Sequence, residues 1–322
     1  MSMDSSPADS LLPATETTPA PTGQPPSMIH TIFLGPNGIR AGWRLLLFLA
    51  VFVAGSSGAN YGLKHIPAFV SWAKSQPKGT ITPTFQIATE GLLVLVLFFS
   101  AWIMAKIEKR SFADYGLPSG VAFGKRFWQG IPFGFVSLSA LLGLIAALHG
   151  FSLAGLEVRG AETVKYGVLF GVGFILAGIF EEFSFRGYLQ ATIGSGIGFW
   201  PAAILLAILF GGVHLGNPGE AKTGALMAGC FGLLAAFSLQ RTGNLWFAIG
   251  MHAAWDWGET YFYGVPDSGL LAKGRLLNSS FHGPDWLTGG TVGPEGSLLV
   301  FAVLVLTGVA IHYVFPAKRG AA

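Results

Sequence analysis

The sequence predicts an all-α protein, a polytopic transmembrane helical bundle of about eight spans. Its 322 residues are 52% hydrophobic, and only 11% of them are Asp, Glu, Lys or Arg. Soluble globular proteins carry about 25% charged residues, and the mean hydropathy of +0.57 is correspondingly high. Eight apolar stretches approach or reach the roughly 20 residues that an α-helix needs to cross a bilayer.

The eight predicted spans follow one another along most of the chain. The fifth and sixth are short and contain Gly and Ala, small residues that let membrane helices approach closely. The 46 glycines of the chain therefore point to a tightly packed bundle. The spans are predicted at 42–62, 84–106, 130–149, 164–184, 199–215, 222–240, 244–263 and 297–316.

The segments outside the spans divide the chain into four regions. Residues 1–28 are rich in Pro, Ser and Thr, which predicts a disordered tail, and they lack the basic start and apolar core of a signal peptide. Residues 29–163 hold the first membrane helices and an interfacial segment near Lys125. Residues 164–263 hold the four central spans, and residues 264–322 a long loop, 264–296, and the last span.

Charge and cysteine content exclude several classes of function. The formal net charge is only +3 and no basic stripe is present, so the sequence predicts no nucleic-acid partner. The single cysteine, Cys230, excludes an internal disulfide and a Cys-cluster metal site. Eleven of the 19 Lys and Arg residues fall on the side of the N-terminus. This predicts an integral protein of the bacterial cytoplasmic membrane with both termini in the cytoplasm.

Three charged residues stand together at the end of the fourth span: Glu181, Glu182 and Arg186. Ionisable side chains inside a membrane are expensive and are functional candidates by default. On a helix, Glu182 and Arg186 are four residues apart and share a face, whereas Glu181 is turned away by about 100°. The simplest interpretation pairs Glu182 with Arg186 and leaves Glu181 available for chemistry. The alternative is a purely structural ion-pair network that joins two helices.

Two further pairs of polar or aromatic residues occur at a spacing of four. Phe210 and His214 share a face of the fifth span, and His214 alone suits a core histidine as well as a functional one. His252 and Asp256 share a face of the seventh span. That spacing suits a carboxylate that orients an imidazole, two metal ligands, or an ordinary buried hydrogen bond.

Taken together, Glu181, His214, His252 and Asp256 come from three spans of a chain with little other intramembrane charge. A carboxylate and two histidines in a cavity of low dielectric constant can activate water and stabilise an oxyanion. The same four residues also suit a divalent metal that lowers the pKa of a bound water.

The three motifs, in this order, resemble those of the CPBP family of intramembrane proteases. That family includes type II CAAX prenyl endopeptidases and bacteriocin-processing or immunity proteins. The flanking "FRGYLQ" and "RTGNLWFAIGMHAAWDW" also fit, and the resemblance covers about residues 164–260. It implies that residues 164–263 are the catalytic core and that Glu181 activates water with the help of His214. It further implies that His252 and Asp256 stabilise the oxyanion, while Glu182 and Arg186 form a structural pair.

One residue departs from the family pattern. CAAX-processing members carry Asn where this chain has Asp256, and an ionised carboxylate would repel an oxyanion. Asp256 is therefore expected to be protonated, to orient His252, or to ligate a metal. The cofactor prediction is accordingly either none or a divalent metal such as zinc, held by Glu181, His214, His252 and Asp256.

The leading functional prediction is an intramembrane endopeptidase. Its partners would be the lipid bilayer and a membrane-associated protein or peptide substrate, either a prenylated CAAX-type protein or a bacteriocin-like peptide. One alternative is a non-proteolytic immunity or scaffold protein of the same fold. The other is a proton-coupled transporter, in which buried Glu and His residues relay protons. The lack of an internal repeat disfavours the transporter.

Overall fold

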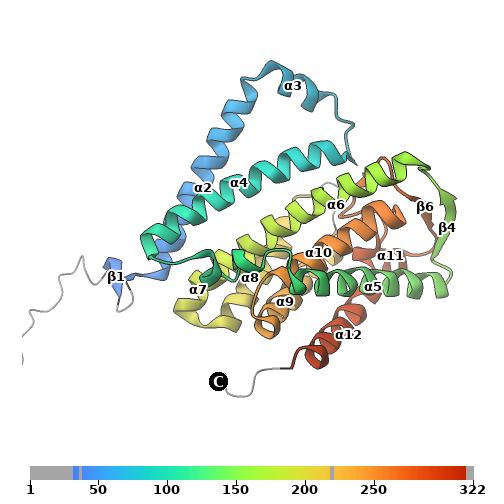
Figure 1. Ribbon diagram of the computed structural model, residues 1–322. Helices are drawn as coiled ribbons and strands as arrows, with labels where there is room; N and C mark the ends of the chain where they lie inside the picture. Colours follow the sequence, from blue (N-terminus) through green and yellow to red (C-terminus); the bar gives the residue numbers. More distant parts are fainter. Residues whose placement is uncertain (1–31, 36–37, 218–220, 317–322) are drawn as a thin grey trace, which may run out of the picture.

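The computed structural model describes residues 32–35, 38–217 and 221–316, so the predicted tail at 1–28 lies outside the described residues. Every predicted span corresponds to a helix within a few residues, which confirms the polytopic helical bundle (Figure 1). These helices are α2 (Ala41–Lys64), α4 (Pro83–Glu108), α5 (Lys125–Ala147), α6 (Ala161–Glu182), α8 (Phe199–His214), α9 (Lys222–Thr242), α10 (Trp246–Trp257) and α12 (Leu299–Val314).

The helices differ in their capacity to cross a membrane. In the described part of the chain, five helices are long and apolar enough to cross a membrane. They are α2, α4, α5, α9 and a continuous helical run at Ala161–Ile197 that starts with α6. Helices α8 and α12 are apolar but have 16 residues each. Helix α10 has 12 residues. Of the eight predicted spans, five thus correspond to described helices that are long and apolar enough to cross a membrane.

Two helices change to π-helical geometry at or next to their motifs, and Arg186 lies within the first π-helical segment. Helix α6 ends at Glu182 and continues as η3 (Phe183–Leu189) and then α7 (Gln190–Ile197). Helix α10 ends at Trp257, one residue after Asp256, and continues as η4 (Gly258–Tyr263). π-helical turns are rare and occur frequently at functional sites.

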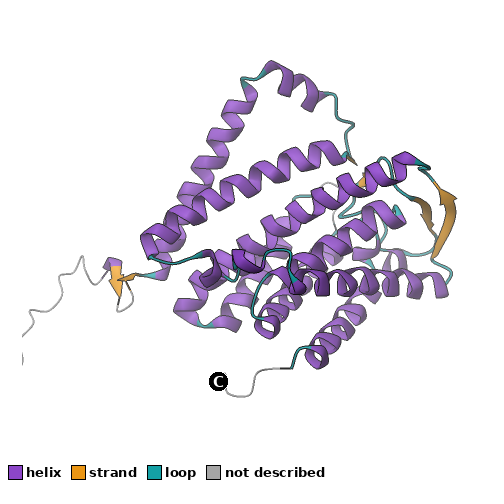
Figure 2. Cartoon of the chain, viewed as in Figure 1, coloured by secondary structure: helices purple, strands orange, loops and turns teal. Residues whose placement is uncertain are grey.

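The remaining elements are short, and the sequence did not predict them. Three two-stranded sheets are formed: β1 (Leu34–Gly35) with β2 (Gly38–Ile39), β3 (Thr80–Ile81) with β5 (Leu271–Ala272), and β4 (Phe151–Leu156) with β6 (Leu277–Phe281). The last pair forms the antiparallel sheet at one edge of Figure 2. The short helices are α3 (Pro67–Lys74), η1 (Phe112–Tyr115), η2 (Ser119–Val121), α11 (Asp285–Thr288) and η5 (Pro294–Gly296). Because β5 and β6 both belong to the 264–296 loop, this loop is fastened to two other connections of the bundle.

Helix α10 is the innermost helix of the bundle. All residues from Trp246 to Trp255 are buried, as expected of a helix that is apolar on every side. It packs against α5, α6 and α9. Glycines allow the close approach to α5, because a Cβ atom on Gly250 would collide with the Phe127 carbonyl group and one on Gly134 with that of Met251. His252 therefore lies on a buried helix that packs closely against its neighbours.

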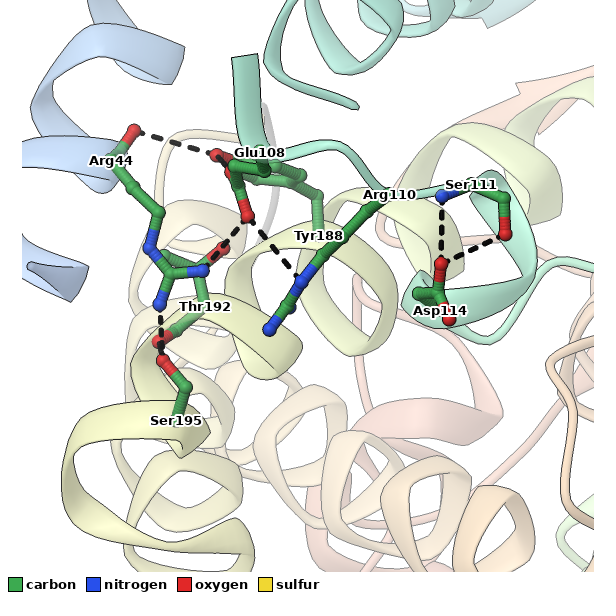
Figure 3. Close-up of polar contacts among 8 residues, drawn as sticks. All are labelled: Arg44, Glu108, Arg110, Ser111, Asp114, Tyr188, Thr192 and Ser195. Carbon is green, nitrogen blue, oxygen red and sulfur yellow. Dashed lines mark hydrogen bonds and ion pairs between the residues drawn. The ribbon is translucent and has the colours of Figure 1, made fainter. Parts of the chain in front are cut away.

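A cluster of charged residues fastens the N-terminal helices to the central ones (Figure 3). Glu108, at the end of α4, accepts a hydrogen bond from Arg44 Nη1 of α2 at 2.8 Å and another from the Tyr188 hydroxyl of η3 at 2.7 Å. Arg44 also donates to the Ser195 hydroxyl of α7. The cluster joins α2 and α4 to the segment that follows the two adjacent glutamates, and no pattern in the sequence indicated it.

Candidate active site

Glu182 is fully buried, with 0% of its surface exposed, and it contacts two cationic or polar partners. Its Oε1 atom accepts a hydrogen bond from Arg186 Nη1 at 3.3 Å. The same atom lies 2.8 Å from His252 Nδ1, and because a carboxylate only accepts, this nitrogen carries the hydrogen. Glu182 therefore holds both Arg186 and the imidazole of the third motif.

Arg186 connects three helices. Its Nε donates to the Gly232 carbonyl oxygen of α9 at 3.3 Å, and its guanidinium carbon lies 4.1 Å from the ring centroid of Phe210 on α8. A Cβ atom at Gly232 would collide with the guanidinium group. Phe210 in turn packs against His214, with ring centroids 4.5 Å apart. The three motifs are thus linked by direct contacts.

His252 is surrounded by three carboxylates. While its Nδ1 faces Glu182, its Nε2 lies 3.6 Å from Glu181 Oε2 and 3.4 Å from Asp256 Oδ2. The Glu181 side chain is 28% exposed, and its Oε2 has no hydrogen-bond partner within the described residues. Of the two adjacent glutamates, Glu182 is committed to structural contacts and Glu181 is not.

A small cavity of about 30 Å³ lies beside this ring. Its wall includes His214, His252 and Asp256, together with Glu295 of the 264–296 loop. The volume has room for one or two waters, because each needs roughly 10–15 Å³ of such space. His214 Nδ1 donates to the Phe210 carbonyl oxygen at 2.7 Å, which leaves Nε2 of this tautomer as an acceptor.

The predicted site residues are therefore brought together unequally. His214, His252 and Asp256 line the cavity, whereas Glu181 approaches the group through its contact with His252 Nε2. Between the described residues Glu181 and His214 no hydrogen bond or ion pair is formed.

Residues 163–258 match the family model described as type II CAAX prenyl endopeptidase, Rce1-like. This central segment is similar to the Rce1-like family. The match contains all three motifs and confirms the resemblance that they predicted. At the level of the family it supports a CAAX-type intramembrane protease, embedded in the membrane and acting on membrane-associated substrates. A comparison with curated proteins found no match.

The Rce1-like segment does not present a compact zinc site at the predicted residues. Zinc lies about 2.0–2.2 Å from its nitrogen and oxygen ligands, so these ligand atoms must gather within roughly 4.4 Å of one another. Within residues 32–35, 38–217 and 221–316, one set of three or more such side chains has its ligand atoms within 4.8 Å: Glu259, Asp267 and Glu295. The four predicted ligands do not form such a set among the described residues.

Sequence reasoning missed two carboxylates near the Rce1-like site. Glu90, on α4, lies close enough to Glu181 and His252 to interact electrostatically with both. Glu90 lies inside the second predicted span. Because charge inside a membrane is costly, this position alone could have marked Glu90 as a functional candidate. No sequence pattern marked Glu295 as a site residue, because it lies in an irregular loop whose path depends on tertiary contacts. In the same loop, burial raises the pKa of Asp267 to about 6.

Proposed function

We propose that this protein is an intramembrane endopeptidase that hydrolyses a peptide bond of a membrane-associated protein or peptide. The family match of residues 163–258 supports the class of reaction. The observation that carries the assignment of roles is the contrast between the two adjacent glutamates. Glu182 is fully buried and its Oε1 accepts hydrogen bonds from Arg186 and His252, whereas Glu181 is 28% exposed and its Oε2 lies 3.6 Å from His252 Nε2, beyond hydrogen-bond distance.

In the proposed reaction, Glu181 is the base that takes a proton from water while the water oxygen attacks the substrate carbonyl carbon. His252 acts as an imidazolium: its Nδ1–H bonds Glu182, and its Nε2–H donates to the oxygen on which negative charge develops. His214 accepts from the water through Nε2 and orients it. When the tetrahedral intermediate collapses, the C–N bond breaks and Glu181 returns its proton to the leaving amine. A base of this kind contributes about 10²–10⁴ to the rate, and one oxyanion donor about 10²–10³.

Glu182 serves as a positioning residue in this mechanism. Its hydrogen bond to His252 Nδ1 fixes the orientation of the ring and turns Nε2 toward Glu181 and Asp256, as carboxylates that support a functional histidine do. Arg186 balances the charge of Glu182 in a fully buried position. The second glutamate and the arginine therefore support the chemistry without entering it.

The substrate must widen the cavity in order to reach these groups. A cavity of about 30 Å³ admits water, whereas sites for larger ligands have volumes of about 300–1,000 Å³. We propose a membrane-associated substrate of the prenylated CAAX type, as the family description suggests, with a bacteriocin-like peptide as the competing class. We further propose that both termini lie in the cytoplasm.

The Glu181→Gln variant tests the catalytic role. We expect the cleavage rate of a farnesylated CAAX peptide in liposomes to fall by about 10²–10⁴, because the general base is lost. The melting temperature in detergent should stay close to that of the wild type. Glu162→Gln is a matched control, since Glu162 lies exposed in the first turn of the same helix and should retain full activity. Cleavage retained in Glu181→Gln would refute the proposal.

Glu182→Gln should fail in a different way. It leaves the buried Arg186 without its charged partner, and breaking a buried pair by removing one partner destabilises proteins by about 3–5 kcal/mol. Thermal unfolding of the purified variant should therefore start at a clearly lower temperature than that of Glu181→Gln. Equal melting temperatures for these two variants would show that Glu182 has no structural role.

A further inference from the structure

Three carboxylates outside the proposed catalytic group gather where the 264–296 loop meets the end of α10. Glu259 belongs to η4, Asp267 to the segment that follows it, and Glu295 to η5. One carboxylate oxygen from each lies within 4.8 Å of the others. Asp256, one helical turn before Glu259, adds a further carboxyl group nearby.

Glu259 is the residue that distinguishes this cluster from an ordinary acidic surface. It is 0% exposed, and neither of its carboxylate oxygens has a hydrogen-bond partner within the described residues. Trp255, one turn earlier, interacts with the Glu259 carboxyl group, but its indole N–H does not meet the distance and angle of a hydrogen bond. An ionised carboxylate that is buried and accepts no hydrogen bond is strongly unfavourable, and a cation bound at Glu259 would remove that cost.

The other two carboxylates are held in fixed orientations. Thr260 Oγ1 donates to Asp267 Oδ2 at 2.8 Å. The backbone N–H and the hydroxyl of Ser268 donate to Glu295 Oε2 at 3.2 Å and 3.1 Å. Supporting hydrogen bonds of this kind orient metal-binding carboxylates.

The type of ligand atom and the spacing select the cation. Three carboxylates without nitrogen or sulfur ligands favour a hard cation such as Ca²⁺ or Mg²⁺. Calcium lies 2.3–2.6 Å from its oxygens, so two of them can be up to roughly 5 Å apart, whereas Mg²⁺ at 2.0–2.1 Å needs them within about 4.2 Å. The three ligand atoms lie within 4.8 Å of one another, which falls inside the range that calcium accepts, so calcium is the ion to test first.

We propose that Glu259, Asp267 and Glu295 form a calcium site that fastens the 264–296 loop to the end of α10. The proposal does not depend on the proposed protease function. A calcium ion at this site would nevertheless affect the cavity, because Glu295 also forms part of the cavity wall beside His214 and His252. A bound ion would hold this wall in place.

Calcium binding to the full-length purified protein tests the proposal. After treatment with EGTA, we expect the wild type to bind one Ca²⁺ per chain in isothermal titration calorimetry, and its melting temperature to rise as CaCl₂ is added. Glu259→Gln should weaken binding at least tenfold and abolish the rise. Asp285→Asn is the matched control, because Asp285 is an exposed carboxylate of the same loop and should leave both responses unchanged.

Further variants separate this site from the catalytic group. Glu181→Gln should respond to calcium as the wild type does, whatever its activity, and a lost response would place the ion at the catalytic group instead. If Glu259→Gln does not fold, Asp267→Asn should show the same weakened binding. Equal calcium affinity in the wild type and in whichever of these two variants folds, or no binding by the wild type, would overturn the proposal. A larger stabilisation by MgCl₂ than by CaCl₂ would overturn the choice of ion.

Discussion

His252 shows how much of the chemistry depends on the surroundings of one side chain. Its two ring nitrogens face different carboxylates, Glu182 on one side and Glu181 with Asp256 on the other. The ring is thus oriented by a fully buried group and presents its second nitrogen to the cavity. This division explains why two adjacent glutamates, which look equivalent in the sequence, have different roles in the proposed mechanism.

Asp256 is the residue whose role is best tested by a conservative change. An amide at this position can donate to an oxyanion and does not repel it, so Asp256→Asn should keep or increase the cleavage rate. Asp256→Leu should lower kcat by about 10²–10³, the usual effect of losing an oxyanion donor. The test is to measure the cleavage rates of both variants on the same farnesylated peptide. An Asn variant as inactive as the Leu variant would contradict a donor role.

Asp114 gives a prediction about pH. The backbone N–H and the hydroxyl of Ser111 donate to its carboxylate at 2.7 Å and 2.9 Å, and the backbone bond is the main reason that the pKa of Asp114 lies below its usual 3.8 (Figure 3). A lowered folded-state pKa stabilises the fold above the unfolded pKa, and this stabilisation is lost as pH falls through the folded value.

The measurement compares the wild type with Asp114→Asn. The wild type should have the higher melting temperature at pH 6, and the difference should shrink toward pH 3, because the carboxylate that accepts these bonds becomes protonated. A difference that is the same at both pH values would show that the charge of Asp114 does not contribute.

At the scale of the helices, the sequence predicted where most helices lie along the chain but not their local backbone geometry. Long apolar runs such as 84–106 and 222–240 mark helices because a membrane penalises any other backbone arrangement. The π-helical turns at Phe183–Leu189 and Gly258–Tyr263 carry no comparable pattern. The strands β5 and β6 were missed because they form only where distant loops meet.

The candidate site shows the same limit. Residue spacing indicated which side chains share a helix face, including Glu182 with Arg186 and His252 with Asp256. It gave no information on contacts between helices, such as the bond from His252 to Glu182 or the packing of Arg186 on Phe210. Those contacts depend on how α6, α8 and α10 are packed.

Packing between α5 and α10 gives a prediction at this scale. The Cβ atom in Gly250→Ala would collide with the backbone of Phe127, and overpacking of this kind costs about 1–3 kcal/mol. Because His252 follows two residues later, we expect a lower melting temperature together with an at least tenfold loss of cleavage. Both are measured on the purified variant.

Gly143→Ala is the control for this change. Gly143 lies within α5, and a Cβ atom added there would meet no atom of a neighbouring element within 4 Å. Alanine there should raise helix stability by up to about 1 kcal/mol and leave cleavage unchanged. If both substitutions behaved alike, close packing at Gly250 would not be what positions the site.

For the whole molecule, the arrangement of α4 allows the proposed orientation to be tested. Ser75 and Ser119 are exposed and lie before and after this 26-residue helix. In a Cys230→Ser background, Ser75→Cys and Ser119→Cys should react with a membrane-impermeant maleimide from opposite sides, with Ser119→Cys accessible from the cytoplasm. The background protein without either cysteine should stay unlabelled. Labelling from one side only would contradict the proposed topology.

The continuous helical run at Ala161–Ile197 is 37 residues long, and its length bears on the water supply of the site. A helix rises 1.5 Å per residue, so the run extends about 55 Å, well beyond the hydrocarbon thickness of about 30 Å. Glu181 lies roughly 30 Å along the axis from Ala161. If the helix is upright and starts at one membrane surface, Glu181 therefore reaches the level of the opposite headgroups, where water is abundant. Tilting the helix would move this carboxylate deeper into the hydrocarbon region.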